Sequence, residues 1–322
     1  MSHDAPAPTP GSMSSASASL QSMMEQECTT YCCDEYLHLD GDSDDDGDSD
    51  DGSCCSMSTL PPPKVTPADR TQLVDWCYVI VDRCGFRREA VAIAMNIADR
   101  FASIPCASSA GNRVEYQLVV LTALCVAIKT NESTNFGIED FTRMSKGLYS
   151  VEDTQEMELK MLHALSWRLC PPTSLQAGNQ ILEMMLPEEA KAALEPDTFQ
   201  FLLDEVSFQT ENAVRDNYFV AKRPSTIAAA AIMNAIENIG NKDSEYLREA
   251  LMCILREHSF ESYDILLEAK CQLLHFLNEE EDRQDDAISL SKRTRESVPE
   301  EEWLVGNAME EALYMYCLFG VN

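Results

Sequence analysis

Apolar residues recur at steps of three and four along most of the chain between residues 69 and 278. This spacing places them on one side of an α-helix, so each such stretch predicts a helix with one buried face. Five stretches of this kind occupy the first half of the region, at 70–86, 88–104, 114–130, 138–148 and 151–169. Five more follow in the second half, at 174–186, 197–216, 224–239, 244–258 and 261–278. The pattern predicts an all-α fold.

In both halves the third expected helix contains a run of small and apolar residues, "LTALCVAI" at 121–128 and "IAAAAIMNAI" at 227–236. Small side chains let neighbouring helices approach from several sides, so we expect each of these helices at the centre of a bundle. Paired prolines in "CPPTSL" end the first set, and Thr173 can cap the next helix. Ser150 and Asp153 offer a capping box for the helix that starts at 151. The sequence therefore predicts tandem five-helix bundles.

Composition separates two tails from this helical body. Met1 to Pro63 contains no Lys or Arg and is rich in Ser, Asp, Pro and Ala, a composition that cannot bury enough apolar surface to fold. We therefore expect a disordered acidic tail over 1–66, bundles over 67–172 and 173–278, and an acidic tail over 279–322. Helical spacing in "NAMEEALYMYCLFG" predicts a short helix inside the last tail.

Charge and cysteine content narrow the function classes. Lys and Arg total 24 against 55 Asp and Glu, a formal net charge of -31, which argues against binding nucleic-acid phosphates and is compatible with a basic protein partner. The 13 cysteines are odd in number and scattered, as in a reduced intracellular protein. No signal peptide and no apolar stretch of membrane-spanning length is evident. We expect a nuclear and cytoplasmic protein without membrane partners.

Two segments raise the question of a metal site. The acidic run "DSDDDGDSDDGS" from Asp42 matches the start of a calcium loop, but Ser53 stands where a bidentate Glu is needed and no amphipathic helix flanks the run. The cysteines at 28, 32 and 33 lack the paired spacing of zinc sites. Phosphate-binding glycine loops, zinc-protease motifs and nucleophile elbows are absent from the sequence. We expect no metal, no cofactor and no catalytic residue, and a binding or regulatory module is the better hypothesis.

Several motifs of the first bundle resemble the cyclin family. They are "LVDW" after Arg70, "IADRFAS", "YQLVVLTALCVAIKTNE" and "MELKMLHALSWRLCPPT". Five positions characteristic of the cyclin box match in order, namely Arg70, Asp99, Leu118, Lys129 and Glu158. The second half, especially "RPSTIAAAAIMNAI", is similar to the C-terminal cyclin fold. The first box resembles those of A, B and D cyclins, and the acidic tails resemble those of G1-type cyclins.

The resemblance implies a non-catalytic regulatory subunit that binds and activates a cyclin-dependent Ser/Thr kinase and controls cell-cycle progression. It assigns kinase contacts to Lys129, Glu158 and Glu132, and an internal ion pair to Arg70 and Asp99. Leu118 would lie in the core of the box. A lysine in the last turn also suits the negative end of a helix dipole, so Lys129 has a purely structural alternative.

Many cyclins carry a docking patch for substrates with a basic residue and a leucine. Leu73, Trp76 and Gln117 fit that patch, whereas Asp69 and Gln72 replace apolar residues. We expect a more polar patch, in which Asp69 would favour basic motifs. The acidic tails imply phosphorylation-dependent turnover, with ubiquitin-ligase components as further partners. The alternative functions are a cyclin-fold scaffold, or a transcription-related adaptor, that does not activate a kinase.

Overall fold

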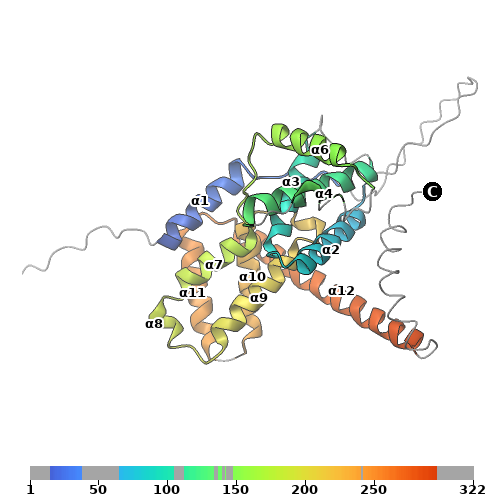
Figure 1. The fold of residues 1–322 in the computed structure, drawn as a ribbon. Coiled ribbons are helices and arrows are strands. Elements are labelled where there is room, and N and C mark those ends of the chain that lie inside the picture. The colour runs from blue at the N-terminus through green and yellow to red at the C-terminus, as the bar shows by residue number, and fades with distance from the viewer. Residues whose placement is uncertain are drawn as a thin grey trace, which may run out of the picture. The chain divides into compact units, whose positions relative to one another are not determined.

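The computed structural model describes residues 15–37, 65–104, 112–133, 137–139, 142, 148–240 and 242–295, and in these ranges every regular element is helical (Figure 1). The chain divides into two compact units. The N-unit comprises Cys33–Cys170, Asn212–Ala221 and Gln272–Asn322, and the C-unit comprises Met1–Cys32, Pro171–Glu211 and Lys222–Cys271. The main division between them, at Cys170–Pro171, lies two residues before the expected bundle boundary.

The N-unit is built from α2 (Pro67–Cys84), α3 (Glu89–Ala102), α4 (Arg113–Asn131) and α6 (Val151–Ala164). Helix α4 contacts the other three, and almost all of its residues from Tyr116 to Ile128 are buried, as expected for a central helix. The capping box predicted from Ser150 and Asp153 is present at the start of α6. A second capping box, from Thr66 and Asp69, begins α2, which ends at Gly85 in the left-handed conformation.

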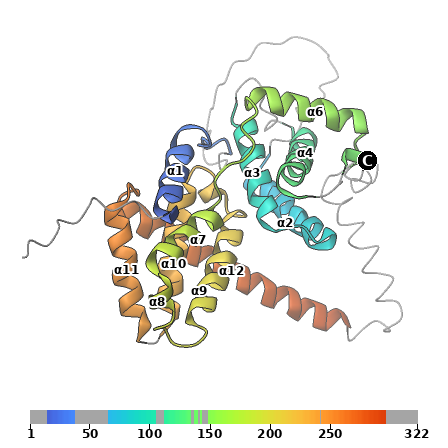
Figure 2. The same ribbon diagram turned by 60° about the vertical axis from the view of Figure 1, so that its left-hand side comes forward.

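The C-unit is built around α10 (Pro224–Asn238), which contacts α1 (Ser15–Thr29), α7 (Ser174–Met185) and α11 (Asp243–Glu257) (Figure 2). Thr173 caps α7 through the amide of Gln176, as predicted. The remaining helices are α8 (Glu188–Lys191), α9 (Thr198–Ala213) and α12 (Tyr263–Arg295), of which α9 and α12 continue into segments of the N-unit. The short η1 (Asn217–Phe219) belongs to the N-unit.

Helix α1 corrects the expectation that residues 1–66 are disordered. Ala16, Leu20 and Met24 recur every four residues and are buried, and the last two join the core of the C-unit. The helix packs against α7 and α10. The apolar residues of α1 are therefore buried by helices that are far away in sequence, which the local composition of the segment does not reveal.

Helix α12 corrects the expected start of the C-terminal tail at residue 279, because it continues to Arg295. Glu, Gln and Arg, which are frequent in this stretch, have high helix propensity. The expected helix at 138–148 lies largely outside the described residues. So do the short helix expected at 307–320 and the acidic run from Asp42.

Helix α4 is long and apolar enough to cross a membrane by length and composition alone. About two thirds of the relevant window, 67%, is buried inside the protein, because the helix forms the centre of the N-unit. The apolar character of α4 is therefore accounted for by packing against α2, α3 and α6.

Candidate protein-binding site

Lys129 and Glu158 lie on neighbouring helices and form an ion pair at the surface of the N-unit. The ammonium of Lys129, in the last turn of α4, lies 2.9 and 2.8 Å from the two carboxylate oxygens of Glu158 on α6. The side chains are 33% and 21% exposed. An ion pair this accessible contributes about 0.2–1 kcal/mol to stability, so both side chains can exchange partners at little cost.

Helix α6 and the turn that follows it each present one large apolar side chain near this pair in sequence. Leu159, next to Glu158, is 55% exposed, and Trp167 is 66% exposed. Ser166 and Trp167 both have positive φ, at 50° and 62°, which is uncommon for residues other than glycine. Residues held in sparsely populated backbone conformations cluster at functional sites, which makes this turn a candidate contact surface. Sequence reasoning missed these two residues, because apolar side chains at helical spacing indicate a core.

Arg70 and Asp99 form a buried ion pair between α2 and α3. Arg70 donates from Nε to Oδ1 at 3.0 Å and from Nη2 to Oδ2 at 2.8 Å, and both side chains are almost fully buried. Burial acts to lower the pKa of Arg70, but the charge of Asp99 and its hydrogen bonds outweigh this and raise the pKa above its usual value. The guanidinium of Arg70 therefore stays charged, and inside the core it depends on the carboxylate of Asp99 as its partner.

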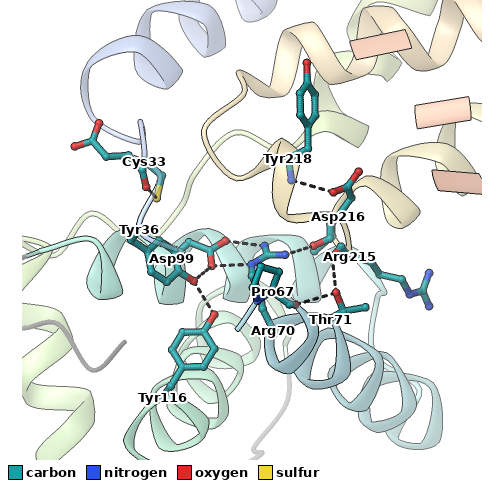
Figure 3. A network of polar contacts seen from close by, with 12 residues as sticks. Cys33, Tyr36, Pro67, Arg70, Thr71, Asp99, Tyr116, Arg215, Asp216 and Tyr218 are labelled. Carbon is teal, nitrogen blue, oxygen red and sulfur yellow. Dashed lines mark hydrogen bonds and ion pairs between the residues drawn. The ribbon is translucent and has the colours of Figure 1, made fainter. Parts of the chain in front are cut away.

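Three further chain segments complete this buried site (Figure 3). Tyr36, which precedes the acidic run, donates its hydroxyl to Asp99 Oδ1 at 2.7 Å and lies 2.7 Å from the hydroxyl of Tyr116 on α4. Arg70 Nη1 donates to the carbonyl of Val214 at 2.7 Å, and Thr71 donates to the carbonyl of Arg215 at 3.0 Å. Burial raises the pKa of both tyrosines well above the usual value, so both stay neutral donors.

Glu132, a sequence-predicted kinase contact, faces the protein itself. It is the C-cap of α4, and its Oε1 accepts from the amide and Nε of Arg87 at 3.0 and 3.2 Å. Arg87 Nη2 also donates to the carbonyl of Asn131 at 2.5 Å. The side chain of Glu132 is 15% exposed, against 63% for Arg87. No sequence motif predicted this contact, because the two residues are 45 positions apart.

The residues of the expected docking patch are mostly covered. Leu73 and Gln117 are buried, and the hydroxyl of Tyr149 donates to Gln117 Oε1 at 3.0 Å. Trp76 and the box residue Leu118 are partly buried and pack against the core of the N-unit. Of the three patch residues, only Trp76 is partly exposed, so docking through this patch stays a prediction.

Asp69 is not available to attract basic motifs in the way the sequence suggested. Its Oδ2 accepts from the amide and hydroxyl of Thr66, both at 2.9 Å, in the capping box of α2. Its Oδ1 pairs with Arg113 at the start of α4. A basic residue of a partner would have to displace Arg113 from this carboxylate.

Metal and thiol chemistry find no support in the described part of the chain. No group of three or more His, Cys, Asp or Glu side chains there could hold a metal ion. The cysteines described are free thiols, and burial raises the pKa of Cys33 to about 12, which keeps it protonated. The acidic run from Asp42 lies outside these residues.

Comparisons with known proteins find sequence similarity to cyclins. The sequence model of "Cyclin, N-terminal domain" matches residues 53–170. Cyclin-B2-2 of Arabidopsis thaliana is 31% identical over 166 residues, covering 52% of this chain and 35% of the relative. Putative cyclin-A3-1 of the same plant is 26% identical over 226 residues, covering 67% and 59%. The chain thus spans less than two thirds of either relative.

A solved structure supports the fold. The viral cyclin from herpesvirus saimiri superposes with a TM-score of 0.50 at 16% identity, covering 67% of this chain and 88% of the viral one. At this identity the likeness concerns the fold alone. It agrees with the all-helical architecture predicted from periodicity.

Proposed function

We propose that this chain, of which residues 53–170 match the N-terminal cyclin domain, is a non-catalytic regulatory subunit that binds and activates a cyclin-dependent Ser/Thr protein kinase in cell-cycle control. The observation that carries the proposal is the pairing of Lys129 with Glu158 at the exposed end of a rigid central helix. The exposed apolar residues Leu159, on α6, and Trp167, in the turn that follows α6, lie close to Glu158 in sequence.

The chemistry of the pair suits recognition of a partner's main chain. The ammonium of Lys129 can donate to carbonyl oxygens, and the carboxylate of Glu158 can accept from amides. In the free chain each side chain holds the other in place, so less conformational entropy is lost when a partner binds. Leu159 and Trp167 would supply the apolar area that a stable protein interface needs.

Activation follows from selective binding. A protein kinase requires an ion pair between a lysine of its small lobe and a glutamate of a mobile helix before ATP is held correctly. A rigid protein that binds only the conformation with this helix in place shifts the kinase toward activity by its difference in affinity for the two states. Helix α4, which is buried over most of the stretch from Tyr116 to Ile128, gives Lys129 that rigidity.

We also propose that the protein acts in the nucleus and the cytoplasm. The basic run "KRTR" from Lys292 to Arg295 is the candidate import signal in this acidic chain. A fluorescent fusion in which Lys292 and Arg293 are replaced by Ala should lose nuclear signal. An unchanged distribution would refute the assignment of this run.

The functional test is reconstitution. The purified full chain is mixed with purified cyclin-dependent kinases, and phosphorylation of a histone substrate is measured with and without the chain. We expect at least one kinase to be activated, and the Lys129→Ala, Glu158→Ala double variant to lose the activation while circular dichroism shows an intact fold. A kinase that binds tightly without gaining activity would favour the scaffold alternative instead.

A further inference from the structure

Arg87 lies in the loop between α2 and α3 and is attached to the C-terminal end of α4. Although 63% of its side chain is exposed, its amide and Nε donate to Glu132, and Nη2 donates to the carbonyl of Asn131. Three contacts from one residue fix the loop to the turn that carries Lys129.

The helix end explains part of this arrangement. The carbonyl of Asn131 is among the last carbonyls of α4, which have no partner within the helix, and the end of a helix carries partial negative charge. The carboxylate of Glu132 is unfavourable at that end unless a cation compensates it. Arg87 satisfies the carbonyl and compensates the carboxylate together.

Arg87 also affects the charges around Lys129. Glu132 follows Lys129 by three residues, directly after the last residue of α4, so the two opposite charges stand close together in the chain. Without Arg87, the carboxylate of Glu132 would be released within reach of the Lys129 ammonium. It would then compete with Glu158, which now holds that ammonium through both oxygens.

We propose that Arg87 is a positioning residue for the kinase-binding surface: it holds Glu132 away from Lys129 and so keeps Lys129 paired with Glu158. The expected effect of Arg87 on kinase binding rests on the proposed function. Glu132 is thus assigned to the support of the surface, in place of the direct kinase contact that the sequence suggested.

The first experiment measures kinase affinity. Arg87→Ala should weaken binding of a kinase that the wild-type chain binds by about three- to tenfold, since apparent affinity falls with the fraction of chains that hold Lys129 in the competent arrangement. The melting temperature should change little. Arg88→Ala is the matched control, because it removes a neighbouring arginine from the same loop, where Arg88 pairs with Asp82 at 2.6 Å. We expect the control to bind within twofold of wild type, roughly the effect of an exposed ion pair.

The decisive variant is the double substitution Arg87→Ala, Glu132→Gln. Because the introduced glutamine side chain carries no charge to compete for Lys129, this variant should recover most of the affinity that Arg87→Ala loses. Glu132→Gln alone measures what the carboxylate itself contributes. If the double variant binds as weakly as Arg87→Ala, Arg87 contacts the kinase directly or only supports folding, and the inference is overturned.

A measurement on the chain alone separates this inference from the proposed function. A double-mutant cycle of unfolding gives the coupling between Lys129 and Glu158, and this coupling should shrink in the Arg87→Ala background. Equal coupling in both backgrounds would refute the competition. If instead the coupling shrinks but no kinase binds the wild-type chain, the proposed function fails while the role of Arg87 stands.

Discussion

The two units carry nearly identical ion pairs in different settings. In the N-unit Lys129 contacts both oxygens of Glu158 at 2.9 and 2.8 Å, and in the C-unit Lys270 contacts both oxygens of Glu237 at 2.7 Å. Lys129 stands in the last turn of a central helix, whereas Lys270 lies in the interior of α12. An ion pair alone therefore does not mark a binding site, and the proposal rests on the place of the Lys129 pair at the end of a central helix.

The buried charges of the units differ as well. The N-unit buries a complete ion pair, Arg70 with Asp99, to which Tyr36 adds a hydroxyl. The C-unit buries two separate carboxylates: Glu27 on α1 accepts from the amide and hydroxyl of Ser225 at the start of α10, and Asp243 on α11 accepts from the amide of Glu195. We therefore expect the removal of one buried charge to lower the stability of the N-unit strongly. The stability of the C-unit should depend more on side-chain packing and on pH.

Asp99→Ala should have the largest effect on stability. It leaves the guanidinium of Arg70 buried without its counter-ion, which costs about 3–5 kcal/mol. Urea denaturation followed by circular dichroism measures the loss. Asp82→Ala, which breaks an exposed pair with Arg88, is the control and should cost less than about 1 kcal/mol. A similar small loss for Asp99→Ala would contradict the buried-pair account.

Gly178→Ala tests packing in the C-unit. A Cβ at Gly178 on α7 would lie 2.8 Å from Cγ1 of Val206 on α9, and Val206 is fully buried, so we expect a loss of about 1–3 kcal/mol. Denaturation midpoints measure it. Adding Val206→Ala removes the clashing methyl group, and the two substitutions should then cost less than their sum. Additive effects would show that the contact is not the cause.

Tyr36→Phe tests whether the segment before the acidic run belongs to the N-unit. It removes a hydrogen bond to a buried carboxylate and should cost about 1–2 kcal/mol in the same denaturation assay. Tyr263→Phe, at a residue that is about half exposed, should cost nothing measurable. Equal stability of the two variants would place Tyr36 outside the structural core.

The buried carboxyl group of Glu27 should make the stability of the C-unit depend weakly on pH. Burial raises the pKa of Glu27 above its usual value, against the hydrogen bonds from Ser225. Because the folded pKa lies above the unfolded one, the stabilisation is present at pH values below the unfolded pKa and is lost as pH rises through the folded one. Glu27→Gln should remove this decline from a series of melting curves at mildly acidic to neutral pH. Parallel curves for wild type and variant would contradict it.

The helices of both bundles could be predicted from the sequence because each buries a periodic apolar face. Helix α1 was missed although Ala16, Leu20 and Met24 have helical spacing, because the surface that buries them lies on α7 and α10, far away in sequence. Tyr36 and Arg87 were missed for a related reason. Their partners, Asp99 and Glu132, are 63 and 45 residues away, and local patterns carry no information on such pairs. Lys129 and Glu158 emerged only from resemblance to a family.

The most direct test of the account compares the two exposed ion pairs in one binding assay. Isothermal titration calorimetry would measure the affinity of a kinase that the chain activates. The kinase would be titrated with the wild-type chain, with the double variant Lys129→Ala, Glu158→Ala, and with the double variant Lys270→Ala, Glu237→Ala. We predict that the first double variant loses roughly tenfold or more in affinity, as central interface residues do, while the second binds like wild type. Equal affinities for both double variants would contradict the assignment of the kinase-binding surface to Lys129 and Glu158.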